Sequence, residues 1–536
     1  MNTDRLTINP LTQNDFYKQG HAPLYPPGTT RVYSNITARK SRIKGINSIV
    51  VFGPQYFIKA YLMGEWQRNF FDKPLEQVRA KYFRVINNTL GPGAVSEKRI
   101  KDLHDLGYLP LSIKALPEGV SCPIRVPCLT ITNTVDHAYW LVNFLESILS
   151  CITWQPITSA TIAKEFRRVL DAYAMETVGD TSFVQWQGHD FSMRGMSSLE
   201  TACTSGGGHL LSFTGTDTIP AIEFLEQYYN ADVEKELVGA SVVATEHAVA
   251  GFNIISILND KPRMADELAD FIKRTPEGMM VRESYDELLI AEFAFLKWLI
   301  TVAHPNGLVS YVGDTYNLFS VIAEILPRLK PEIMARNGKL VIRPDSFWTD
   351  PVDCLCGFGG WNPRMEELTA EEVDVVRKGL IESLWDIFGG TKTIKDYKLL
   401  DSHIGAIYGD SITIERAEAI CLRFKAKGFA SINSVYGVGS YTYQFNTRDT
   451  FGLAIKATWG MVNGQPVNVF KDPVSDEGMK KSARGLIRVE GKSGHYTYKD
   501  CCTPEEEAGG ELKEVFRDGK LLIDYTLAQI RANLAL

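Results

Sequence analysis

The middle of this 536-residue chain predicts an α/β fold built on a parallel sheet or barrel. Short apolar runs rich in β-branched residues recur there, and each run ends in small or charged residues. Helical patterns follow two of the runs directly. Strand, polar turn and helix in alternation are typical of parallel α/β sheets and barrels. The first third mixes strand-like and helical stretches and predicts an α+β region.

Five apolar runs are the predicted strands of this sheet. They cover residues 238–243, 308–312, 340–342, 403–408 and 432–436. Predicted helices at 316–329 and 414–424 each place their apolar residues on one face. In the first third, residues 30–37 predict a strand and residues 56–70 predict a helix.

Polar residues and one glycine follow the predicted strands at or near their carboxyl ends. They are His247, Asp314, Arg343, Asp345, Asp410 and Gly439. Ligand sites of parallel sheets and barrels lie at the carboxyl ends of the strands. We therefore expect these residues to belong to one shared site.

Two of these strand ends offer groups suited to a sugar phosphate. The Asp345 carboxylate suits sugar hydroxyls or a Mg²⁺-bound water, and the Arg343 guanidinium suits a carbonyl or phosphate oxygen. Gly409 allows close backbone approach, and Asp410 is an acid of the kind that holds a ribose diol. The alternatives are a surface ion pair for Arg343 and Asp345 and a helix N-cap at Asp410.

A short Gly-rich turn and a run of cations follow the last predicted strand. Gly437, Gly439 and Ser440 can present backbone N–H groups to a phosphate, but the turn is neither a Walker loop nor a complete dinucleotide fingerprint. The cations after it either meet a polyphosphate or form an ordinary solvated face. They are Arg448, Lys456, Lys471, Lys480, Lys481 and Arg484.

Two further positions offer a reactive group and a place for a flat ring. His247, beside Glu246, is either an acid–base or nucleophilic group or a satisfied structural histidine. Phe191 and Arg194, with Asp217, offer an aromatic face and polar handles for a heterocycle. The alternative for Phe191 is simple core packing.

Composition limits the classes of protein and partner. Lys and Arg number 57 and Asp and Glu 64, a net charge of −7, so we expect no nucleic-acid binding, although a small anionic ligand is still allowed. Apolar residues at 45% and charged residues at 23% exclude a disordered chain or a fibre. No apolar run is long enough to span a membrane, and the N-terminus lacks the pattern of a signal peptide. Nine cysteines without zinc-type spacing indicate reduced thiols, so we expect a cytoplasmic protein.

Motifs in a characteristic order occur along nearly the whole chain. They are Asp15-Phe16-Tyr17-Lys18, Tyr25-Pro26-Pro27-Gly28-Thr29, Asp190-Phe191, Gly215-Thr216-Asp217-Thr218, Glu246-His247, Ile342-Arg343-Pro344-Asp345-Ser346, Gly409-Asp410, Thr447-Arg448-Asp449 and Phe470-Lys471-Asp472-Pro473. Together they resemble the nicotinamide phosphoribosyltransferases of the type II phosphoribosyltransferase family. The resemblance implies an irregular parallel β/α barrel at 181–445 and a second, α+β domain built from both chain ends, 1–180 and 446–536. It also implies a homodimer with two active sites at the subunit interface.

The resemblance implies phosphoribosyl transfer from 5-phosphoribosyl 1-pyrophosphate to nicotinamide in NAD salvage. ATP would be a co-substrate that phosphorylates His247, and Mg²⁺ would be carried by the pyrophosphate with no direct protein ligand. Catalysis would rest on His247, Asp345 and Arg343. Nicotinamide would contact Phe191, Asp217, Arg194, Ser241 and Tyr17 of the partner subunit. Ribose and its phosphate would contact Ser310, Asp314, Gly409, Asp410, Gly439, Ser440 and Arg448. The pyrophosphate or ATP phosphates would contact Arg39, Lys456 and Lys471.

The sequence departs from the family pattern in three places. The loop at 437–441 lacks a run of three glycines, the lysines at 480–481 are offset by about one residue, and residues 346–393 do not align clearly.

Three alternatives compete with this interpretation. A nicotinate phosphoribosyltransferase shares the architecture, but the Asp217 carboxylate would repel the carboxylate of nicotinate. An inactive relative that acts as a binding protein should have lost His247, Asp345 or Arg448, and all three are present. An unrelated barrel hydrolase or aldolase should carry a metal-ligand set or a lone Schiff-base lysine, and we recognise neither in the sequence.

Overall fold

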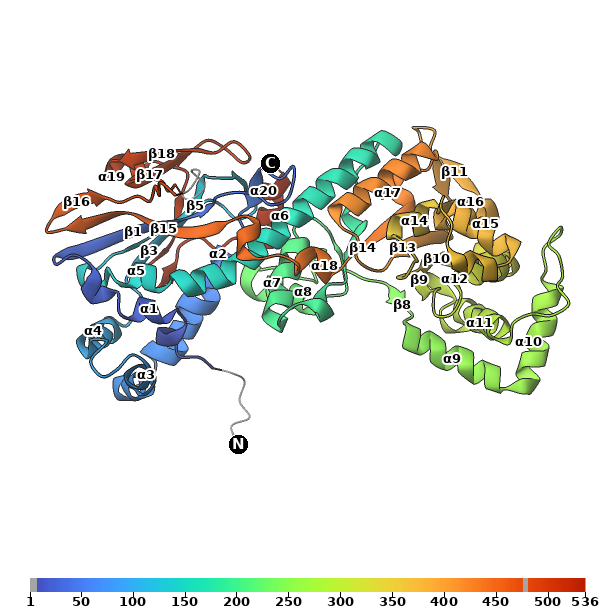
Figure 1. The fold of residues 1–536 in the computed structure, drawn as a ribbon, viewed down its shortest axis with the longest axis horizontal. Helices are drawn as coiled ribbons and strands as arrows, with labels where there is room; N and C mark the ends of the chain where they lie inside the picture. Colours follow the sequence, from blue (N-terminus) through green and yellow to red (C-terminus); the bar gives the residue numbers. More distant parts are fainter. Residues whose placement is uncertain (1–6, 476–480, 536) are drawn as a thin grey trace.

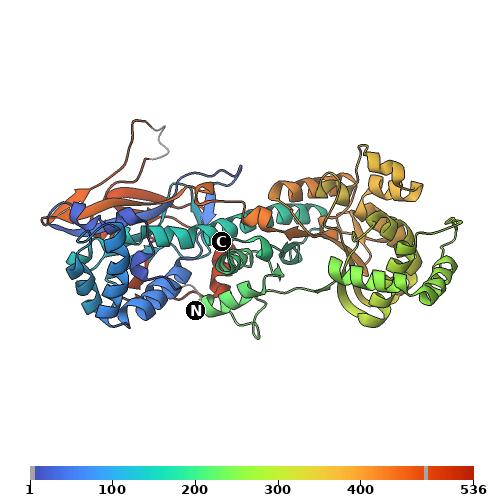
Figure 2. The ribbon, with the colours of Figure 1, turned by 60° about the horizontal axis from the view of Figure 1, so that its bottom comes forward.

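The protein is described by a computed structural model covering residues 7–475 and 481–535. Two halves lie side by side, one built on an antiparallel sheet and one on a parallel sheet (Figure 1). Helix α6 (Glu146–Thr177) runs between them and packs against elements of both. The C-terminal helix α20 (Leu527–Ala535) lies near the middle of the molecule, where Lys164 Nζ of α6 donates to the carbonyl of Leu534 at 3.1 Å (Figure 2).

The antiparallel sheet is built from both ends of the chain. Its strand order is β16-β15-β1-β5-β3-β19-β20. The bounds are β16 Gln465–Asn468, β15 Leu453–Val462, β1 Thr29–Ala38, β5 Pro127–Asn133, β3 Leu111–Ala115, β19 Lys513–Arg517 and β20 Lys520–Leu521. Its central strands carry nearly continuous buried runs, which shows that both faces of the sheet are covered there, because successive side chains of a strand point to opposite faces. Strands β1 and β15 pair along their whole length, with Asn35 opposite Lys456.

The parallel sheet curls until its two edges almost meet. Its strand order is β7-β6-β14-β13-β10-β9-β8. The bounds are β7 Gly215–Thr216, β6 Gly188–Asp190, β14 Ser434–Val438, β13 Ile404–Tyr408, β10 Asn337–Arg343, β9 Asn306–Val312 and β8 Val243–Ala244. Ala240, three residues before β8, forms an isolated bridge with Gly215 of β7. The sheet is therefore an irregular parallel barrel, which confirms the predicted fold class.

Helices cover both sheets, and small hairpins complete the two halves. Around the antiparallel sheet lie α1 Phe16–Gln19, α2 Pro54–Phe57, α3 Leu75–Thr89, α4 Glu97–Leu106, α5 Leu141–Phe144 and α19 Pro504–Ala508. Around the parallel sheet lie α7 Leu199–His209, α8 Ile219–Tyr229, α9 His247–Asn259, α10 Lys261–Lys273, α11 Glu287–Trp298, α12 Leu318–Ser320, α13 Leu326–Ala335, α14 Pro351–Cys356, α15 Ala370–Lys378, α16 Leu380–Phe388, α17 Ile414–Ala426 and α18 Ser440–Tyr443. The smaller pairs join β2 Ser48–Val50 with β4 Ser121–Pro123, β11 Gly390–Lys392 with β12 Lys398–Leu400, and β17 Leu486–Glu490 with β18 Thr497–Cys502.

Most predicted elements are present, and one was wrong in part. The strand predicted at 30–37 is β1, the helix predicted at 414–424 is α17, and residues 318–335 are helical throughout. The run at 238–243 is not one strand. Its backbone pairs with β7 at Ala240 and with β9 only from Val243 onward, because the chain must change partners where the barrel closes.

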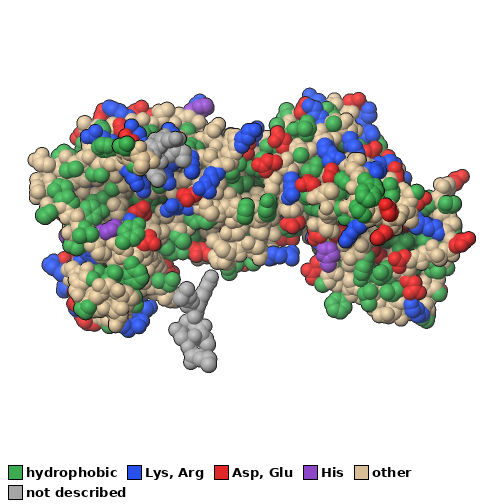
Figure 3. All heavy atoms as spheres, in the orientation of Figure 1, with side chains coloured by type: hydrophobic (Ala, Val, Ile, Leu, Met, Phe, Trp, Pro, Cys, Tyr) green, Lys and Arg blue, Asp and Glu red, His purple; other side chains and the backbone are tan. Residues whose placement is uncertain are grey.

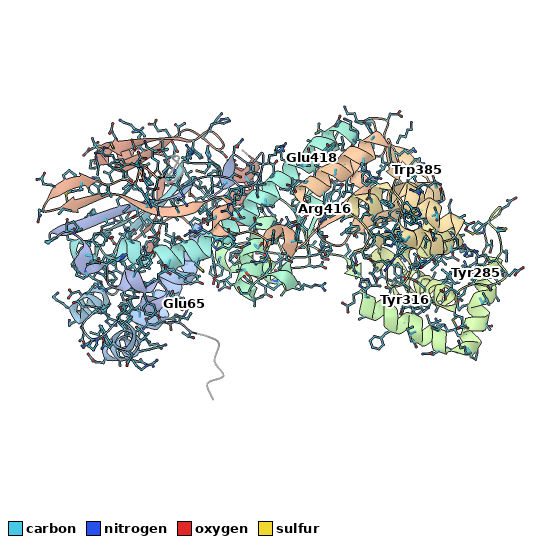
Figure 4. All side chains as sticks on the ribbon, in the orientation of Figure 1. Glu65, Tyr285, Tyr316, Trp385, Arg416 and Glu418 are labelled. Carbon is cyan, nitrogen blue, oxygen red and sulfur yellow. The ribbon has the colours of Figure 1, made fainter. Side chains whose placement is uncertain are left out.

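Residues 346–393, which do not align clearly with the family, form part of the helical layer over the parallel sheet. Beneath this layer the Arg328 guanidinium is fully buried and lies 3.9 Å from the centre of the Phe271 ring. It donates to the Glu324 carboxylate at 2.7 Å and to the Tyr285 hydroxyl at 3.5 Å, and Tyr285 lies on the outer side of the helical half (Figure 4). The buried charge is paired, as burial requires. Among the described residues no helix combines the length and the apolar character needed to cross a membrane.

Candidate active site

Three neighbouring strands bring His247, Asp314 and Asp345 together. Strands β9 and β10 pair in parallel with Val312 opposite Arg343, so the residues two positions further on, Asp314 and Asp345, lie side by side. His247 begins α9, just after β8, which pairs with β9. Its Nε2 lies 3.1 Å from Asp314 Oδ1 and 3.9 Å from Asp345 Oδ1. The structure therefore brings these three predicted residues together at neighbouring strand ends.

Asp314 is the fixed member of this cluster. Its Oδ2 accepts from the backbone N–H groups of Asp345 at 3.1 Å and Ser346 at 2.9 Å, and from the Ser346 hydroxyl at 2.6 Å. Burial works against ionisation, but these hydrogen bonds and the one to His247 outweigh it and lower the pKa of Asp314. Asp314 is thus an ionised carboxylate that holds one nitrogen of His247.

Asp345 is the open member of the cluster. Burial and the neighbouring charge of Asp314 raise its pKa, and the charges of His247 and Arg343 offset this only in part. Its side chain is 38% exposed, whereas that of Asp314 is 6% exposed. Asp345 is therefore the carboxylate that a ligand can reach. The ligand atoms of His247, Asp314 and Asp345 all lie within 4.8 Å of one another, a spacing that one cation can bridge.

Two strand-end groups near this cluster lack partners in the part of the chain that the structure describes. Ser310 Oγ on β9 and Arg343 Nε on β10 are both buried without a hydrogen bond. The other end of the guanidinium is held, because Arg343 Nη2 donates to the Thr245 carbonyl at 2.5 Å. Buried polar groups are nearly always satisfied, so these two atoms are candidates for contact with a bound ligand.

Glycines allow the next strand ends to approach closely. A Cβ on Gly409 would lie 3.2 Å from the Asp345 Cβ, and a Cβ on Gly439 would lie 2.8 Å from Asp410 Oδ1. A Cβ on Gly195, next to Arg194, would lie 2.0 Å from Ser440 Oγ. The predicted sugar-phosphate residues therefore continue without a break from Asp345 through Asp410 and Gly439 to Ser440.

Phe191 and Asp217 follow β6 and β7 and form the last part of this rim. The Phe191 ring lies 4.5 Å from the His189 ring, centre to centre, and its backbone N–H donates to Val438 at 3.0 Å. Asp217 Oδ1 accepts from His189 Nε2 at 2.8 Å and from Ser241 Oγ at 2.5 Å. Burial opposes the charge, but these bonds and the Arg343 charge lower the pKa of Asp217. Asp217 is thus an ionised acceptor beside an aromatic ring.

The predicted phosphate-binding cations form a separate group on the antiparallel sheet. Arg39 follows β1, and its Nε donates to the Gly452 carbonyl at 2.9 Å. Burial lowers the pKa of Lys456, and the charges of Arg39 and Lys471 lower it further, so the three cations lie near one another. None of the hydrogen bonds or ion pairs in the described ranges joins them to the strand-end residues of the parallel sheet. Figure 3 shows Lys and Arg side chains gathered on the antiparallel half.

Tyr17 and Arg448 lie apart from both the strand-end residues and the cations of the antiparallel sheet. Both line a cavity of about 1180 Å³ together with Glu146 of α6 and Leu199 of α7. Tyr17 is 60% exposed, and Phe191 and Asp217 do not line this cavity. A single chain therefore does not bring Tyr17 to Phe191. Lys480, the other predicted phosphate lysine, lies outside the described residues.

Sequence reasoning missed three residues of the site. The first is His189, which holds Asp217 together with the predicted Ser241. The second is Thr245, whose carbonyl accepts from Arg343, and the third is Ser346, which donates to Asp314. One signal was available for His189. It lies on β6, two residues before Phe191, and alternate residues of an extended chain share a face.

Comparisons with known proteins identify the family of this chain. Residues 186–520 match the model of the nicotinate phosphoribosyltransferase (NAPRTase) family, and residues 9–89 match that of the nicotinamide phosphoribosyltransferase N-terminal domain. A protein of Acinetobacter baylyi named nicotinamide phosphoribosyltransferase is 44% identical, covering 98% of this chain and 97% of its own length. Proteins of the same name from Mycoplasma pneumoniae and Xanthomonas campestris pv. campestris are 30% and 29% identical, covering 89% and 98% of this chain and 96% and 98% of their own lengths.

Solved structures share the fold at low sequence identity. Human nicotinic acid phosphoribosyltransferase has a TM-score of 0.53 at 14% identity, over 97% of this chain and 93% of that one. The nicotinate-nucleotide pyrophosphorylase of Pyrococcus furiosus has a TM-score of 0.50 at 13% identity, over 100% and 97%. The barrel, its strand-end site and these matches define an enzyme of the pentosyltransferase class. More narrowly, the chain belongs to the nicotinate phosphoribosyltransferase family, and to the branch whose curated members are named nicotinamide phosphoribosyltransferases.

Proposed function

We propose that this enzyme transfers the phosphoribosyl group of 5-phosphoribosyl 1-pyrophosphate to nicotinamide, giving nicotinamide mononucleotide and pyrophosphate in NAD salvage. The observation that carries the choice of base is Asp217, an ionised carboxylate held beside the Phe191 ring by His189 and Ser241. A carboxylate accepts the N–H of a carboxamide but repels the carboxylate of nicotinate. Arg194 is exposed and lies three residues after Phe191, and it would contact the base from the rim.

The strand ends supply the groups that the sugar phosphate needs. The carboxylates of Asp345 and Asp410 would hold the ribosyl hydroxyls. Ser310 Oγ and Arg343 Nε, which have no hydrogen-bond partner among the described residues, would contact the ribosyl group or the carboxamide. The Gly439–Ser440 turn, with Arg448, would bind the 5′-phosphate. Transfer builds positive charge on C1 of the ribose and negative charge on the departing pyrophosphate, so nearby carboxylates and cations stabilise the two ends.

We propose that ATP phosphorylates His247. Nε2 of the imidazole is committed to the ionised Asp314, which leaves Nδ1 with the lone pair that attacks the γ-phosphorus. The bond to the bridging oxygen breaks, and ADP leaves. The charge that remains on Asp314 stabilises the positive charge of the phosphorylated ring. Asp314 thus positions His247, and Arg343 and Asp345 contact the substrates.

Mg²⁺ would reach the site on the pyrophosphate or ATP. Mg²⁺ binds oxygen ligands and keeps several waters, and the exposed Asp345 carboxylate is suited to contact such a water. The ion would neutralise phosphate charge as the pyrophosphate departs.

A homodimer with shared sites would unite the three separate groups of predicted residues. Tyr17 is 60% exposed and lies in a different cavity from Phe191, so Tyr17 of the partner subunit would complete a sandwich around the pyridine ring. The apolar residues around β8 and α9 are also uncovered in one chain, with Val243 58% exposed and Phe252 82% exposed. We also propose a cytoplasmic location, because buried cysteines such as Cys122, Cys354 and Cys421 are free thiols.

The test is product analysis by mass after mixing the enzyme, phosphoribosyl pyrophosphate and Mg²⁺ with nicotinamide or nicotinate, with and without ATP. We expect nicotinamide mononucleotide as the main product and a higher yield with ATP. Preferred formation of nicotinate mononucleotide would favour the alternative, a nicotinate phosphoribosyltransferase. Binding of the base without either product would favour an inactive binding protein.

A further inference from the structure

A small cavity on the antiparallel sheet carries more positive charge than the predicted phosphate residues account for. Its volume is about 180 Å³, and its lining includes Arg39 and Lys456, which were predicted to bind phosphate. Arg125 and Lys481 also line it, together with Tyr498 and Asp500. Four cations therefore face a cavity that contains one carboxylate.

The carboxylates near this cavity already have partners. Asp500 Oδ2 accepts from the Arg484 backbone N–H at 3.1 Å, and Asp472 pairs with Lys481 at 3.2 Å. Burial and the charges of Arg39 and Lys471 lower the pKa of Lys456, and the Glu146 charge opposes them. The charges of Arg39 and Arg125 thus lack a balancing carboxylate in the described ion pairs, and an anion in the cavity would supply that balance.

The backbone conformation of Arg125 places this residue at the edge of the cavity. It lies in the turn between β4 and β5 with φ +76°, the left-handed region that favours glycine. Its backbone N–H donates to the carbonyl of Ala38 at 2.6 Å, next to Arg39. The Arg125 charge also lowers the pKa of Tyr498, across the cavity, although burial and Asp500 raise it more. Such a conformation at a non-glycine residue persists only where surrounding contacts hold it, so the position of Arg125 beside the cavity is fixed.

We propose that Arg125 binds the phosphate oxygens of a pyrophosphate or triphosphate group in this cavity, beside Arg39 and Lys456. The inference rests on the proposed function and deepens it, because it adds Arg125 to the residues that bind the polyphosphate. A planar guanidinium presents two parallel N–H donors to two phosphate oxygens, whereas a lysine ammonium acts as a point charge without this fixed geometry.

The backbone of Arg125 makes a decisive variant available. Arg125→Gly removes the guanidinium and at the same time relieves the φ +76° strain, so the variant should melt at the same or a higher temperature than the wild type. We expect its dissociation constant for Mg²⁺-pyrophosphate, measured by calorimetry, to rise by about tenfold or more. Arg125→Lys keeps the charge but loses the two-point contact, and its affinity should fall between those of the glycine variant and the wild type.

Two controls separate backbone and charge effects from phosphate contact. Asn463→Gly relieves another left-handed residue of the same sheet, at φ +50°, and Lys520→Ala removes an exposed charge from β20. Both should leave pyrophosphate affinity within about twofold of the wild-type value. Separate titrations with pyrophosphate and with ATP show which phosphate source depends on Arg125.

The outcomes distinguish this inference from the proposed function. Wild-type affinity in Arg125→Gly, or no binding of pyrophosphate and ATP by the wild type, overturns the role of Arg125. If the wild type makes no mononucleotide but its pyrophosphate affinity depends on Arg125, the proposed function fails and the anion site stands. If product forms and Arg125→Gly loses pyrophosphate affinity while keeping its melting temperature, both are supported.

Discussion

Replacing Glu292 by glutamine tests whether a buried carboxyl group near the strand-end cluster makes the stability of the protein depend on pH. Glu292 lies on α11, is 2% exposed, and accepts a hydrogen bond from the Tyr311 hydroxyl of β9 at 2.6 Å. Burial raises its pKa from 4.5 to about 7, although the Tyr311 hydrogen bond lowers it and the Asp314 charge adds a smaller increase. At neutral pH the group therefore sits at the midpoint of its titration.

The size and sign of the effect follow from this shift. The folded protein binds the Glu292 proton more tightly than the unfolded chain between pH 4.5 and about 7. The stabilisation is complete below pH 4.5 and is lost as pH rises through the folded pKa, at about 1.4 kcal/mol per pH unit and about 3 kcal/mol in total. Glu292→Gln keeps the shape and a hydrogen-bonding partner for Tyr311 but does not titrate.

The assay is the apparent melting temperature of wild type and variant at one protein concentration, from pH 5 to pH 9. We expect similar values near pH 5 and a variant that melts roughly 5–10 °C higher than the wild type above pH 8, for a domain of about 250 residues. Glu287→Gln, at the exposed start of the same helix, is the control and should show no such divergence. A constant difference between wild type and Glu292→Gln across this range would refute the reasoning.

Three further predictions concern the site itself. Asp217→Asn should raise the ratio of kcat/KM for nicotinate to that for nicotinamide by about a hundredfold, because a like-charge contact is removed, and an unchanged ratio would remove Asp217 from base selection. His247→Ala should abolish ATP stimulation, measured as product formed with and without ATP, and leave slow ATP-independent transfer; stimulation that persists would exclude the phosphohistidine. Gly437→Ala places a Cβ 2.6 Å from the Tyr408 carbonyl oxygen and should destabilise the fold by about 1–3 kcal/mol, measured by thermal unfolding, whereas Gly359→Ala, with open space around it, should not.

The long strands and their ends were predictable because local sequence determines them. The runs that became β9, β10 and β13 are rich in β-branched residues and end in polar turns, so their parallel order alone placed Asp314 beside Asp345. The strands β6, β7 and β8 have two or three residues, too few to show a period. The run at 238–243 was predicted as one strand because its change of partner at the barrel closure depends on β7, which is distant in sequence.

The supporting contacts of the site could not be predicted for the same reason, although the two-residue spacing of His189 and Phe191 gave a signal for the position of His189. The hydrogen bond of Ser346 to Asp314 and that of His189 to Asp217 join residues 32 and 28 positions apart, and each requires two loops to meet. The turn at Arg125 lacks a glycine, so nothing in its sequence indicates a left-handed residue.

Helix α6 has a mechanical consequence for the proposed enzyme. With 32 residues it is about 48 Å long, and it packs against elements of both sheets. In its first third, Gln155 Nε2 donates to the Tyr443 carbonyl, three residues after the Gly439–Ser440 turn, at 2.9 Å. The helix therefore fixes the distance between the antiparallel sheet, which carries Arg39 and Lys456, and the parallel barrel of the same chain. In the proposed dimer, the distance between the strand-end residues of one subunit and the groups contributed by its partner then depends on the relative position of the two subunits. Substitutions in that contact should alter substrate affinity even where no residue of the site is touched.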